Sequence, residues 1–461
     1  MDFPTEPRIL ARPEHSISRR DIDPAALKVL YRLSRNGHTA YLVGGAVRDL
    51  LLGCRPKDYD IGTSATPEQV LDLFRNSRII GRRFPIVHVL FGRDKVVEVA
   101  TFRATSPEEE ELTESPPASD QDSVEEEDRL QSEADSLLDE ENGGGPPVAK
   151  PPRPRARRGD RGRHLLEFSR DLQYGTPAED ARRRDLTING LFYDIADFSV
   201  IDWVEGLPDL AAGIVRVIGD PDQRIIADPV RMVRVLRHAA RADFRIEPAT
   251  WAAVERHRER LGECSKARVL EEFYRDLRGG AACRSLALMK KSGLLATLLP
   301  QLDGFLPPWP ADGETPLPWR RLEVLDHRIE AGAVYSPAFL LGVLMTFPFL
   351  DHLSASLAGR GGRPDVGRLA YRFLKPLTAH LGVARRDTER LFLISISQRR
   401  LERCREGQPV PGFFRNKPYF AEARELFLLD AEARGLEIGE LRFAEGTRRR
   451  RGRRRRSRRR A

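Results

Sequence analysis

The sequence is poor in the residues that build metal knuckles and disulfide frameworks. Four cysteines occur among 461 residues, without a CxxC pair: Cys54, Cys264, Cys283 and Cys404. This pattern excludes a zinc knuckle and a disulfide scaffold, and it indicates buried free thiols.

Long hydrophobic runs are equally scarce. Residues 1–10 include acidic side chains and no apolar core, and the best apolar run, from Phe339 to Leu350, contains Pro348. We expect Pro348 to break this run, so the sequence predicts neither a signal peptide nor a membrane span. A cytoplasmic location is the resulting expectation.

Charge is abundant but unevenly placed. The 77 Lys and Arg residues and the 69 Asp and Glu residues give a net charge of +8. From Glu108 to Glu141 there are sixteen acidic residues and one basic residue, and from Lys150 to Arg163 there are seven basic residues and one acidic residue. Such segments bury too little apolar surface to fold, so we predict a disordered insertion over 106–163, acidic and then basic.

A second charged segment ends the sequence. Arg448 to Arg460 contains eleven arginines, interrupted by Gly452 and Ser457. A cationic tail on a basic body favours a polyanionic partner such as a nucleic acid, with strongly salt-dependent binding. The alternative is a solvated tail without a dedicated partner.

Local signals predict an α/β head followed by a helical half, in a chain with room for about three domains. Asp23 and Pro24 begin a helix that Gly37 ends. The further predicted elements are a strand over Ala40–Val43, a helix from about Val47 to Leu52, a strand over Asp58–Gly62, a helix from Thr66 and Pro67 to Phe74, a hairpin of Ile86–Phe91 and Lys95–Phe102, apolar segments at Leu186–Tyr193 and Val200–Val204, and helices from Asp228 onward.

Two carboxylates of the predicted strand over Asp58–Gly62 share one face, because residues i and i+2 of a strand point the same way. Asp58 and Asp60 are hard oxygen ligands of the kind that Mg²⁺ prefers. Glu98, on a later strand, would complete a triad for two-metal phosphoryl or nucleotidyl transfer. For the Asp-x-Asp pattern alone, a polar strand end is the alternative.

Gly44 and Gly45 join a strand to a helix, an arrangement in which backbone amides can approach a phosphate group. A plain tight turn is the alternative. Arg48, one helical turn later, is suited to phosphate contact or to pairing with Asp49. The pattern is not the GxGxxG dinucleotide fingerprint, because the third glycine is missing.

Taken together, these residues resemble a known family. The segment LVGGAVRDLLLG from Leu42 to Gly53, followed by Asp58-Tyr59-Asp60, resembles the opening motif of the class II nucleotidyltransferases, the family of bacterial poly(A) polymerases and CCA-adding enzymes. The segment from Glu179 to Asn189 resembles the ribose-contacting motif of that family, and the segment from Asp228 to Arg234 resembles its nucleobase-selecting motif. The matches extend from about Ile17 to Leu277.

Within the family, the closer likeness is to bacterial poly(A) polymerase. It lies in the lead-in from Ile17 to Leu33, in the segment from Gly81 to Phe84 and in the arginine-rich end. The phosphohydrolase domain of some CCA-adding enzymes is not expected, because no His-Asp dipeptide occurs and the nine histidines are scattered.

The resemblance implies an α+β fold: a polymerase-beta-like nucleotidyltransferase head, built as a mixed sheet with helices, and then an all-helical neck, body and tail. The predicted division is an N-terminal extension over 1–22, a head over 23–205 interrupted by the insertion, a neck with the nucleobase-binding region over 206–290, a helical body that binds RNA over 291–440 and a disordered arginine-rich tail over 441–461.

The resemblance also implies roles for residues of the head. Asp58, Asp60 and Glu98 would hold two Mg²⁺ ions, with Mn²⁺ as an alternative metal. The residues implied in nucleotide binding are Gly44, Gly45 and Arg48 at the turn and Arg183, Arg184 and Asp185 in the ribose-contacting motif. For the second group, a surface basic run is the alternative.

In the neck, the resemblance implies that Asp228 and Arg231 bind the nucleobase from one helical face. Asp228 is also suited to cap the following helix. Ala227 replaces the glutamate that the family usually has before this aspartate. Arg268 and Glu272 are expected to form an i, i+4 pair that supports the neck.

The implied function is template-independent addition of AMP from ATP to RNA 3′ ends, a poly(A) polymerase activity. One alternative is a CCA-adding or A-adding tRNA nucleotidyltransferase, and another is a non-catalytic RNA-binding protein on a polymerase-like scaffold. The expected partners are RNA 3′ ends and, beyond them, RNA-decay factors, with no membrane. The acidic insertion has the opposite sign to the tail, which motivates the hypothesis that it competes with RNA for basic surface.

Overall fold

The computed structural model describes residues 6–81, 85–92, 95–104, 174–310, 313–358, 365–405 and 409–437. The chain divides into two compact units: a head unit, Met1–Ala211 with Ile218–Gln223, and a helical unit, Ala212–Val217 with Arg224–Ala461. The predicted insertion over 106–163, the predicted tail over 441–461 and residues 82–84 of the segment from Gly81 to Phe84 lie outside the described residues.

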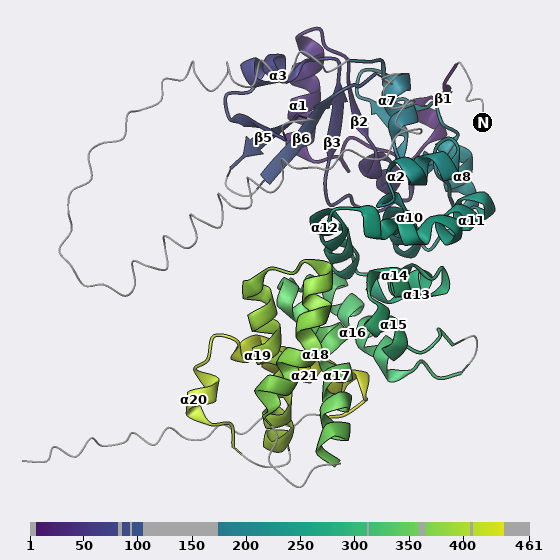
Figure 1. Ribbon diagram of the computed structural model, residues 1–461. Coiled ribbons are helices and arrows are strands. Elements are labelled where there is room, and N and C mark those ends of the chain that lie inside the picture. The colour runs from purple at the N-terminus through teal and green to yellow at the C-terminus, as the bar shows by residue number, and fades with distance from the viewer. Residues whose placement is uncertain are drawn as a thin grey trace, which may run out of the picture. The chain divides into compact units, whose positions relative to one another are not determined.

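An eight-stranded mixed sheet organises the head unit (Figure 1). The strand order is β1-β8-β7-β2-β3-β6-β5-β4; β3 and β6 are parallel, and the other neighbours are antiparallel. The elements are β1 (Arg8–Leu10), η1 (Arg12–Glu14), α1 (Pro24–Arg35), β2 (Ala40–Val43), α2 (Gly45–Leu51), β3 (Asp60–Thr63), α3 (Pro67–Leu73), β4 (Ser77–Ile80), β5 (Ile86–Phe91), β6 (Lys95–Thr101), α7 (Pro177–Arg183), η4 (Thr187–Asn189), β7 (Leu191–Asp194), β8 (Val200–Asp202) and α8 (Gly206–Ala212).

Capping residues set the ends of the first head helices, as predicted. The carboxylate of Asp23 accepts a hydrogen bond of 2.7 Å from the Ala25 amide, and Pro24 takes the first position of α1. Thr66 caps α3 and exchanges hydrogen bonds with Gln69 in a capping box. The hairpin of β5 and β6 is also confirmed.

The two faces of the sheet differ in chemistry. On one face, the buried residues Leu42, Ile61 and Val99 are register partners on β2, β3 and β6 and lie on the side of α1. On the other face, Asp60 and Glu98 occupy the next positions of β3 and β6. Because side chains alternate along a strand, a buried apolar row on one face places the carboxylates together on the opposite face.

An aromatic cluster anchors the β2 and β7 half of the carboxylate face. Phe192 packs edge-to-face on Trp203 with ring centroids 5.1 Å apart, and both belong to a buried cluster with Val43, Phe102 and Ala181 of α7. Each buried aromatic of this kind contributes about 1.5–3 kcal/mol through burial. Next to this cluster on the same face, β3 and β6 carry the polar side chains of Asp60 and Glu98.

Two observations bear on the predicted boundaries of the head, which stay predictions. Within the predicted extension over 1–22, Arg8–Leu10 forms the edge strand β1, antiparallel to β8. Beyond the predicted neck start at 206, most of α8 belongs to the head unit. Neither short segment carries a strong periodic signal, and pairing with distant residues decides where each belongs.

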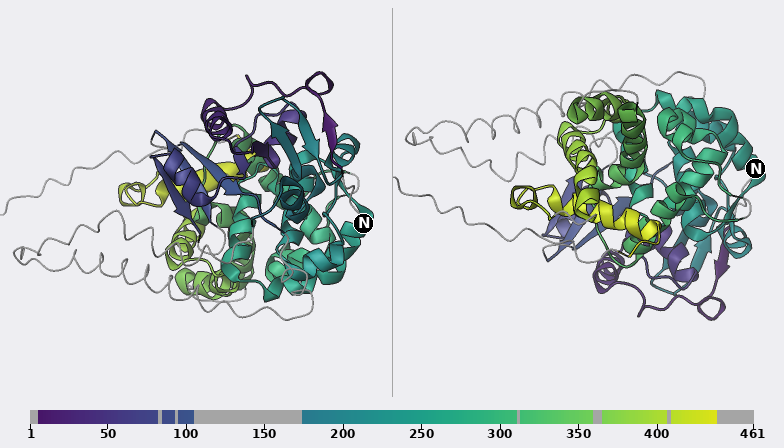
Figure 2. Two further views of the ribbon diagram at one scale, coloured as in Figure 1. Left: turned by 90° about the horizontal axis from the view of Figure 1, so that it is seen from above. Right: turned by 90° about the horizontal axis from the view of Figure 1, so that it is seen from below.

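The helical unit is built almost entirely of helices, and Figure 2 shows α17, α18, α19 and α21 side by side. The remaining pieces include one small parallel sheet of β9 and β10. The elements are β9 (Ile214–Val215), α9 (Pro221–Ala227, which begins in the head unit), α10 (Arg231–Ala242), β10 (Arg245–Ile246), α11 (Pro248–His257), η5 (Arg258–Glu263), α12 (Lys266–Leu277), α13 (Ala282–Lys291), α14 (Leu294–Leu298), α15 (Pro300–Phe305), α16 (Leu317–Glu330), α17 (Pro337–Ala358), α18 (Val366–Leu381), α19 (Arg385–Arg405), α20 (Gly412–Arg415) and α21 (Phe420–Ala433).

Helix α17 corrects the prediction that Pro348 breaks the apolar run. The helix continues through Pro348 from Pro337 to Ala358. Its window Pro337–Leu357 is long and apolar enough to cross a membrane, but 67% of the window is buried inside the structure. Because α17 packs against α18, α19 and α21, its apolar residues form the centre of the helical unit.

Candidate active site

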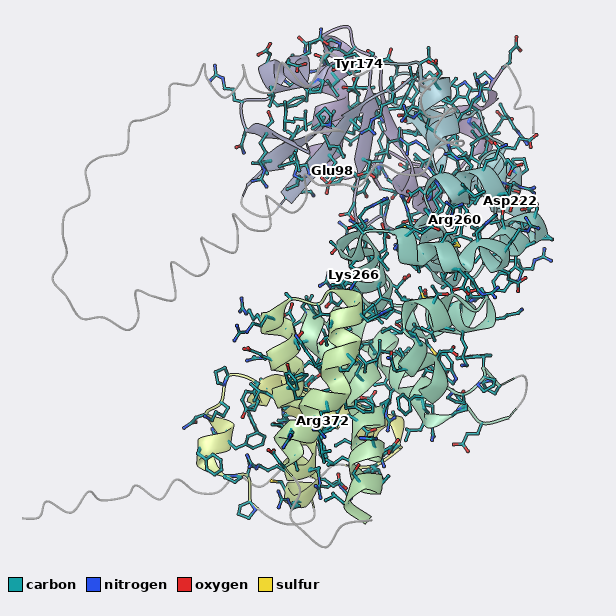
Figure 3. All side chains as sticks on the ribbon, viewed as in Figure 1. Glu98, Tyr174, Asp222, Arg260, Lys266 and Arg372 are labelled. Carbon is teal, nitrogen blue, oxygen red and sulfur yellow. The ribbon has the colours of Figure 1, made fainter. Side chains whose placement is uncertain are left out.

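Asp60 and Glu98 are direct neighbours across the parallel pair of β3 and β6. Asp60 is the first residue of β3, and Glu98 lies in the middle of β6, where Figure 3 labels it. Glu98 is exposed, whereas Asp60 keeps an exposed side although the surrounding protein removes much of the solvent from its carboxyl group. The fold therefore brings together two carboxylates that are 38 positions apart in the chain, as the sequence predicted.

Asp58 lies near this pair but not on the strand. The prediction that Asp58 and Asp60 share a strand is wrong, because β3 begins at Asp60 and Asp58 precedes it in an irregular segment. Tyr59 donates a hydrogen bond of 3.0 Å to the backbone oxygen of Asp21, which ties this segment to the start of α1. Asp58 is exposed and still acts electrostatically on Asp60.

The pKa of Asp60 is raised to about 6. Loss of solvent around the carboxyl group is the main cause, followed by repulsion from Glu98 and, more weakly, from Asp58; Arg184 acts in the opposite direction. Removing water and adding like charge both disfavour the carboxylate form. A cation placed near this group would relieve that repulsion.

The donor chemistry of these three residues fits a divalent metal. Carboxylate oxygens are the ligands that Mg²⁺ prefers, and the mutual repulsion at Asp60 shows that the negative charges are close enough to interact. In the described part of the chain, however, no group of three or more His, Cys, Asp or Glu side chains is already arranged to hold a metal ion. The side-chain positions of the triad are therefore not those of a closed metal site.

The Gly44 turn connects β2 to α2 beside this pair. Val43 is the register partner of Asp60, and Gly44 follows it with φ of 74° and ψ of −137°. This backbone conformation favours glycine, and the next residue, Gly45, begins α2. The amides of Val47 and Arg48 donate to the Gly44 oxygen, so the amides at the start of α2 that suit an anion are those of Gly45 and Ala46. The predicted helix start at Val47 is two residues late.

Arg184 closes over this turn. Its Nη1 atom lies 2.9 Å from where a Cβ of Gly44 would stand, and its charge lowers the pKa of Asp60. Its Nη2 atom donates a 3.0 Å bond to Asp180, and its guanidinium lies 5.1 Å from the centre of the Phe192 ring. A cation held by protein contacts thus lies beside the glycine turn and acts electrostatically on Asp60.

Arg48 is held by protein side chains. It is buried, its Nε and Nη2 atoms donate to Oδ1 of Asp49 at 2.8 and 2.7 Å, and its Nη1 atom donates to Oδ1 of Asn189 at 2.7 Å. Of the two alternatives that the sequence left open, the contacts of Arg48 favour pairing with Asp49 over contact with phosphate. The bond to Asn189 ties α2 to the segment after α7.

The other two residues of the ribose-contacting motif lie at the end of α7 and just beyond it. Arg183 donates a hydrogen bond to the backbone oxygen of Ala104, next to the strand β6. Asp185 is buried, and its Oδ1 atom accepts a bond of 2.9 Å from the Leu186 amide. Burial of Asp185 argues against the alternative that this motif is only a surface basic run.

Asp228 and Arg231 belong to the helical unit, at the junction of α9 and α10. Both oxygens of the Asp228 carboxylate accept 3.1 Å bonds from Nη2 of Arg268, and Nη1 of Arg231 donates to the backbone oxygen of Arg224 at 2.6 Å. The N-cap position of α10 is Val230, without a side-chain cap. Asp228 therefore does not cap α10.

The expected pair of Arg268 and Glu272 is not formed. Arg268 binds Asp228 instead, and Glu272 binds the buried Arg237 of α10 and Arg275 on its own helix. The i, i+4 spacing permits a pair but does not require one, and here Asp228, just after α9, and Arg237 of α10 are the partners. The expectation that this segment supports the neck is consistent with both bonds.

His88 and Asn189 are neighbours of the site that sequence reasoning did not single out. His88 of β5 is the register partner of Glu98, and its Nε2 atom lies 3.2 Å from Oε1 of Glu98. The available signal for His88 was a single polar residue between Val87 and Val89 in an apolar strand, on the face opposite theirs. For Asn189, only its place in the motif pointed to a role.

Two family models match the chain. The model "Poly A polymerase head domain" matches residues 40–216, and the model "Probable RNA and SrmB-binding site of polymerase A" matches residues 243–306. The first range contains the carboxylates and the Gly44 turn, and the second begins shortly after Asp228 and Arg231.

Curated relatives and solved structures agree with these models. Poly(A) polymerase I of Salmonella typhi is 38% identical over 346 residues, which are 74% of this chain and 64% of that protein. Poly(A) polymerase I of Haemophilus influenzae is 31% identical over 94% of this chain and 86% of that protein. The Bacillus stearothermophilus CCA-adding enzyme in complex with CTP has the same fold, with a TM-score of 0.55, 22% identity and coverage of 90% of this chain and 78% of that chain.

The fold and the matching head-domain model define a nucleotidyltransferase of the polymerase-beta-like class. The chain belongs to the class II nucleotidyltransferases, the family that includes proteins named poly(A) polymerase I and CCA-adding enzyme. It spans 64% of the length of the Salmonella relative.

Proposed function

We propose that this protein is a template-independent poly(A) polymerase that adds AMP from ATP to RNA 3′ ends. The observation that carries the proposal is the pairing of Asp60 with Glu98, beside a glycine turn that Arg184 covers. The named relatives support the reaction, and the carboxylates, the turn and the cation supply the three elements that nucleotidyl transfer needs.

Asp58, Asp60 and Glu98 would hold Mg²⁺, with Mn²⁺ as a substitute. When bound, the metal supplies charge neutralisation at the triphosphate and a lowered pKa of the attacking 3′-hydroxyl group. The role of the three carboxylates would be to concentrate negative charge at one place on the sheet. A bound cation would offset the repulsion that Glu98 and Asp58 exert on Asp60.

The remaining head residues bind and orient the nucleotide. The backbone amide of Gly45 and the guanidinium of Arg184 would contact the phosphates, with Arg183 nearby at the end of the same helix, whereas the Gly44 amide donates to the backbone oxygen of Leu191 and Gly44 would serve by its turn conformation. Asp185 would act on the ribose, and Arg48 would hold Asn189 rather than touch the nucleotide. Catalysis then consists mainly of positioning and charge stabilisation.

Asp228 and Arg231 would select the base. An adenine amino group can donate to Asp228, and Arg231 can donate to a ring nitrogen. In this structure Arg268 occupies both oxygens of Asp228, so base binding would require Asp228 to share or exchange that partner. Ala227, in place of the usual family glutamate, removes one carboxylate from this region.

A CCA-adding or A-adding tRNA nucleotidyltransferase is the second candidate, since solved CCA-adding enzymes share the fold. The test incubates the protein with a generic RNA and with a tRNA lacking its CCA end, each with a single NTP. Long products with ATP alone support the proposal, whereas strict CTP incorporation on the tRNA contradicts it. Asp60→Asn is the control, and it should abolish addition to every substrate.

A non-catalytic RNA-binding protein is the third candidate function, and it predicts no nucleotide addition with Mg²⁺ or Mn²⁺.

We propose a cytoplasmic location, because ATP and RNA are both present there. We also propose RNA-decay factors as partners of the RNA-bound enzyme. Cell fractionation and recovery of RNase-sensitive complexes test these two points.

A further inference from the structure

Asp60, Glu98 and His88 form one continuous row across β3, β6 and β5. Asp60 is the register partner of Glu98, and Glu98 is the register partner of His88. Residues directly opposite each other on neighbouring strands place their side chains on the same face. Glu98 therefore has a carboxylate on one side and an imidazole on the other.

The contact between His88 and Glu98 is direct. Nε2 of His88 lies 3.2 Å from Oε1 of Glu98, and the two side chains are 21% and 49% exposed. Nδ1 of His88 is buried and has no hydrogen-bond partner among the described residues. A proton on Nδ1 would leave a buried donor without an acceptor, so the favoured tautomer carries the proton on Nε2, the atom that faces Glu98.

The strand itself has no need for a histidine at this position. Val87 and Val89 of β5 are buried on the opposite face, so they anchor the strand without His88. A β-branched residue would suit the position better for strand stability. Glu98, in contrast, is half exposed, has three rotatable side-chain bonds and is repelled by Asp60. The close contact with Nε2 of His88 restricts the orientations of the Glu98 side chain.

We propose that His88 is a positioning residue that holds Glu98 in the orientation required for metal binding. This inference rests on the proposed function, because it assigns Glu98 to the metal. Ligating carboxylates are commonly oriented by a hydrogen-bond donor behind them, and loss of such a donor weakens metal binding.

The test compares His88→Leu, His88→Gln and His88→Asn with the wild type. The glutamine amide can place a donor near the position of Nε2, whereas the asparagine amide is too short to do so. The first readout is Mn²⁺ affinity, measured by electron paramagnetic resonance with a non-hydrolysable ATP analogue at fixed pH. The second is the split of kcat and KM for ATP and RNA, and the third is the melting temperature.

We expect His88→Leu to lower Mn²⁺ affinity and kcat by about 10- to 100-fold while leaving KM for RNA unchanged. His88→Asn should behave like His88→Leu, and His88→Gln should recover most of both quantities. The matched control is Arg78→Gln, because Arg78 is the exposed register partner on the far side of His88 and should be silent.

Two results would overturn the inference: a folded His88→Leu variant with wild-type Mn²⁺ affinity, or a folded His88→Gln variant as weak as His88→Leu. If His88→Leu does not fold, the contrast between the glutamine and asparagine variants decides the question. If the wild type binds Mn²⁺ but adds no nucleotide, the proposed function fails, and the Mn²⁺ affinities still report on His88. If the wild type binds no Mn²⁺, both proposals fall.

Discussion

Arg184 and Gly44 are in direct contact although 140 positions separate them in the sequence. The guanidinium Nη1 atom of Arg184 stands 2.9 Å from the place that a Cβ atom on residue 44 would occupy. The contact joins the end of α7 to the turn after β2, beside the carboxylate of Asp60. The turn thus requires glycine at position 44 for two reasons: its backbone conformation is one that other residues rarely adopt, and a Cβ atom there would meet the Arg184 guanidinium.

Gly44→Ala should therefore cost stability and activity together. A side chain at φ of 74° and ψ of −137° is strained by about 1–3 kcal/mol, and the new methyl group would displace Arg184. The control is Gly45→Ala, where the added Cβ meets Arg48 at an ordinary 3.5 Å and alanine favours the helix. Urea unfolding and ATP affinity measure both effects. Equal behaviour of the two variants would contradict this assignment.

Arg48 should stabilise the head rather than bind ATP. Arg48→Lys replaces a buried fork that reaches both Asp49 and Asn189, and we expect it to lower the free energy of unfolding by about 1–3 kcal/mol with unchanged KM for ATP. Asn189→Ala should have a similar effect, and the double variant should be less destabilised than the sum of the two single variants. A raised KM for ATP at unchanged stability would instead place Arg48 on the phosphates.

Asp276 should make the stability of the helical unit depend on pH. It is buried and accepts a 3.0 Å bond from Ser285, and burial raises its pKa from 3.8 to about 7, against the opposing effect of Arg237. The folded chain therefore keeps a proton that the unfolded chain releases between these values, so stability falls as pH rises from 3.8 to about 7. Above that range this contribution levels off.

Asp276→Asn removes that proton, so its stability relative to the wild type should rise from about pH 4 to about pH 8. Urea unfolding at several pH values measures the difference. Glu314→Gln serves as the control, because the Glu314 side chain is 81% exposed and should show no such trend. A constant difference between Asp276→Asn and the wild type across pH would contradict the expectation.

The arginine-rich end should contribute salt-dependent RNA affinity. Deleting Arg448 to Arg460 removes eleven positive charges. For single-stranded RNA, the slope of log affinity against log salt becomes shallower by about 0.7 for every phosphate that the deletion leaves without its arginine. Filter binding from low to moderate salt measures the slope. An unchanged slope would mean that the tail is solvated and does not bind RNA.

The acidic insertion should act in the opposite direction. Deleting residues 106–145 removes sixteen acidic residues, and we expect tighter RNA binding at low salt, with the gain disappearing as salt screens the charges. A variant in which the same acidic residues become glutamine or asparagine separates charge from chain length. Unchanged affinity at low salt in the deletion variant rules out competition with RNA.

Much of the head could be predicted because its signals are local. The caps at Asp23 and Thr66, the strand over Ala40–Val43 and the hairpin around Gly92 depend on residues within one or two turns of each other. Asp60 and Glu98 could be assigned to one site from the sequence, because each is an acidic residue in an otherwise apolar predicted strand. The start of β3 at Asp60 could not be predicted. The segment before it contacts a residue distant in the sequence, through the hydrogen bond from Tyr59 to the backbone oxygen of Asp21.

The sequence by itself determined which chemical groups are present at the site. They are the two glycines of the turn, the carboxylates of Asp60 and Glu98, and the basic motif after the insertion. Only the tertiary structure decided their partners. It brought Arg184 close to Gly44 and His88 close to Glu98. It also formed the hydrogen bonds of Arg48 with Asn189 and of Arg268 with Asp228. The physical reason is that a side chain's chemistry is a local property, whereas its hydrogen-bond partner depends on strand register and helix packing between residues far apart in the chain.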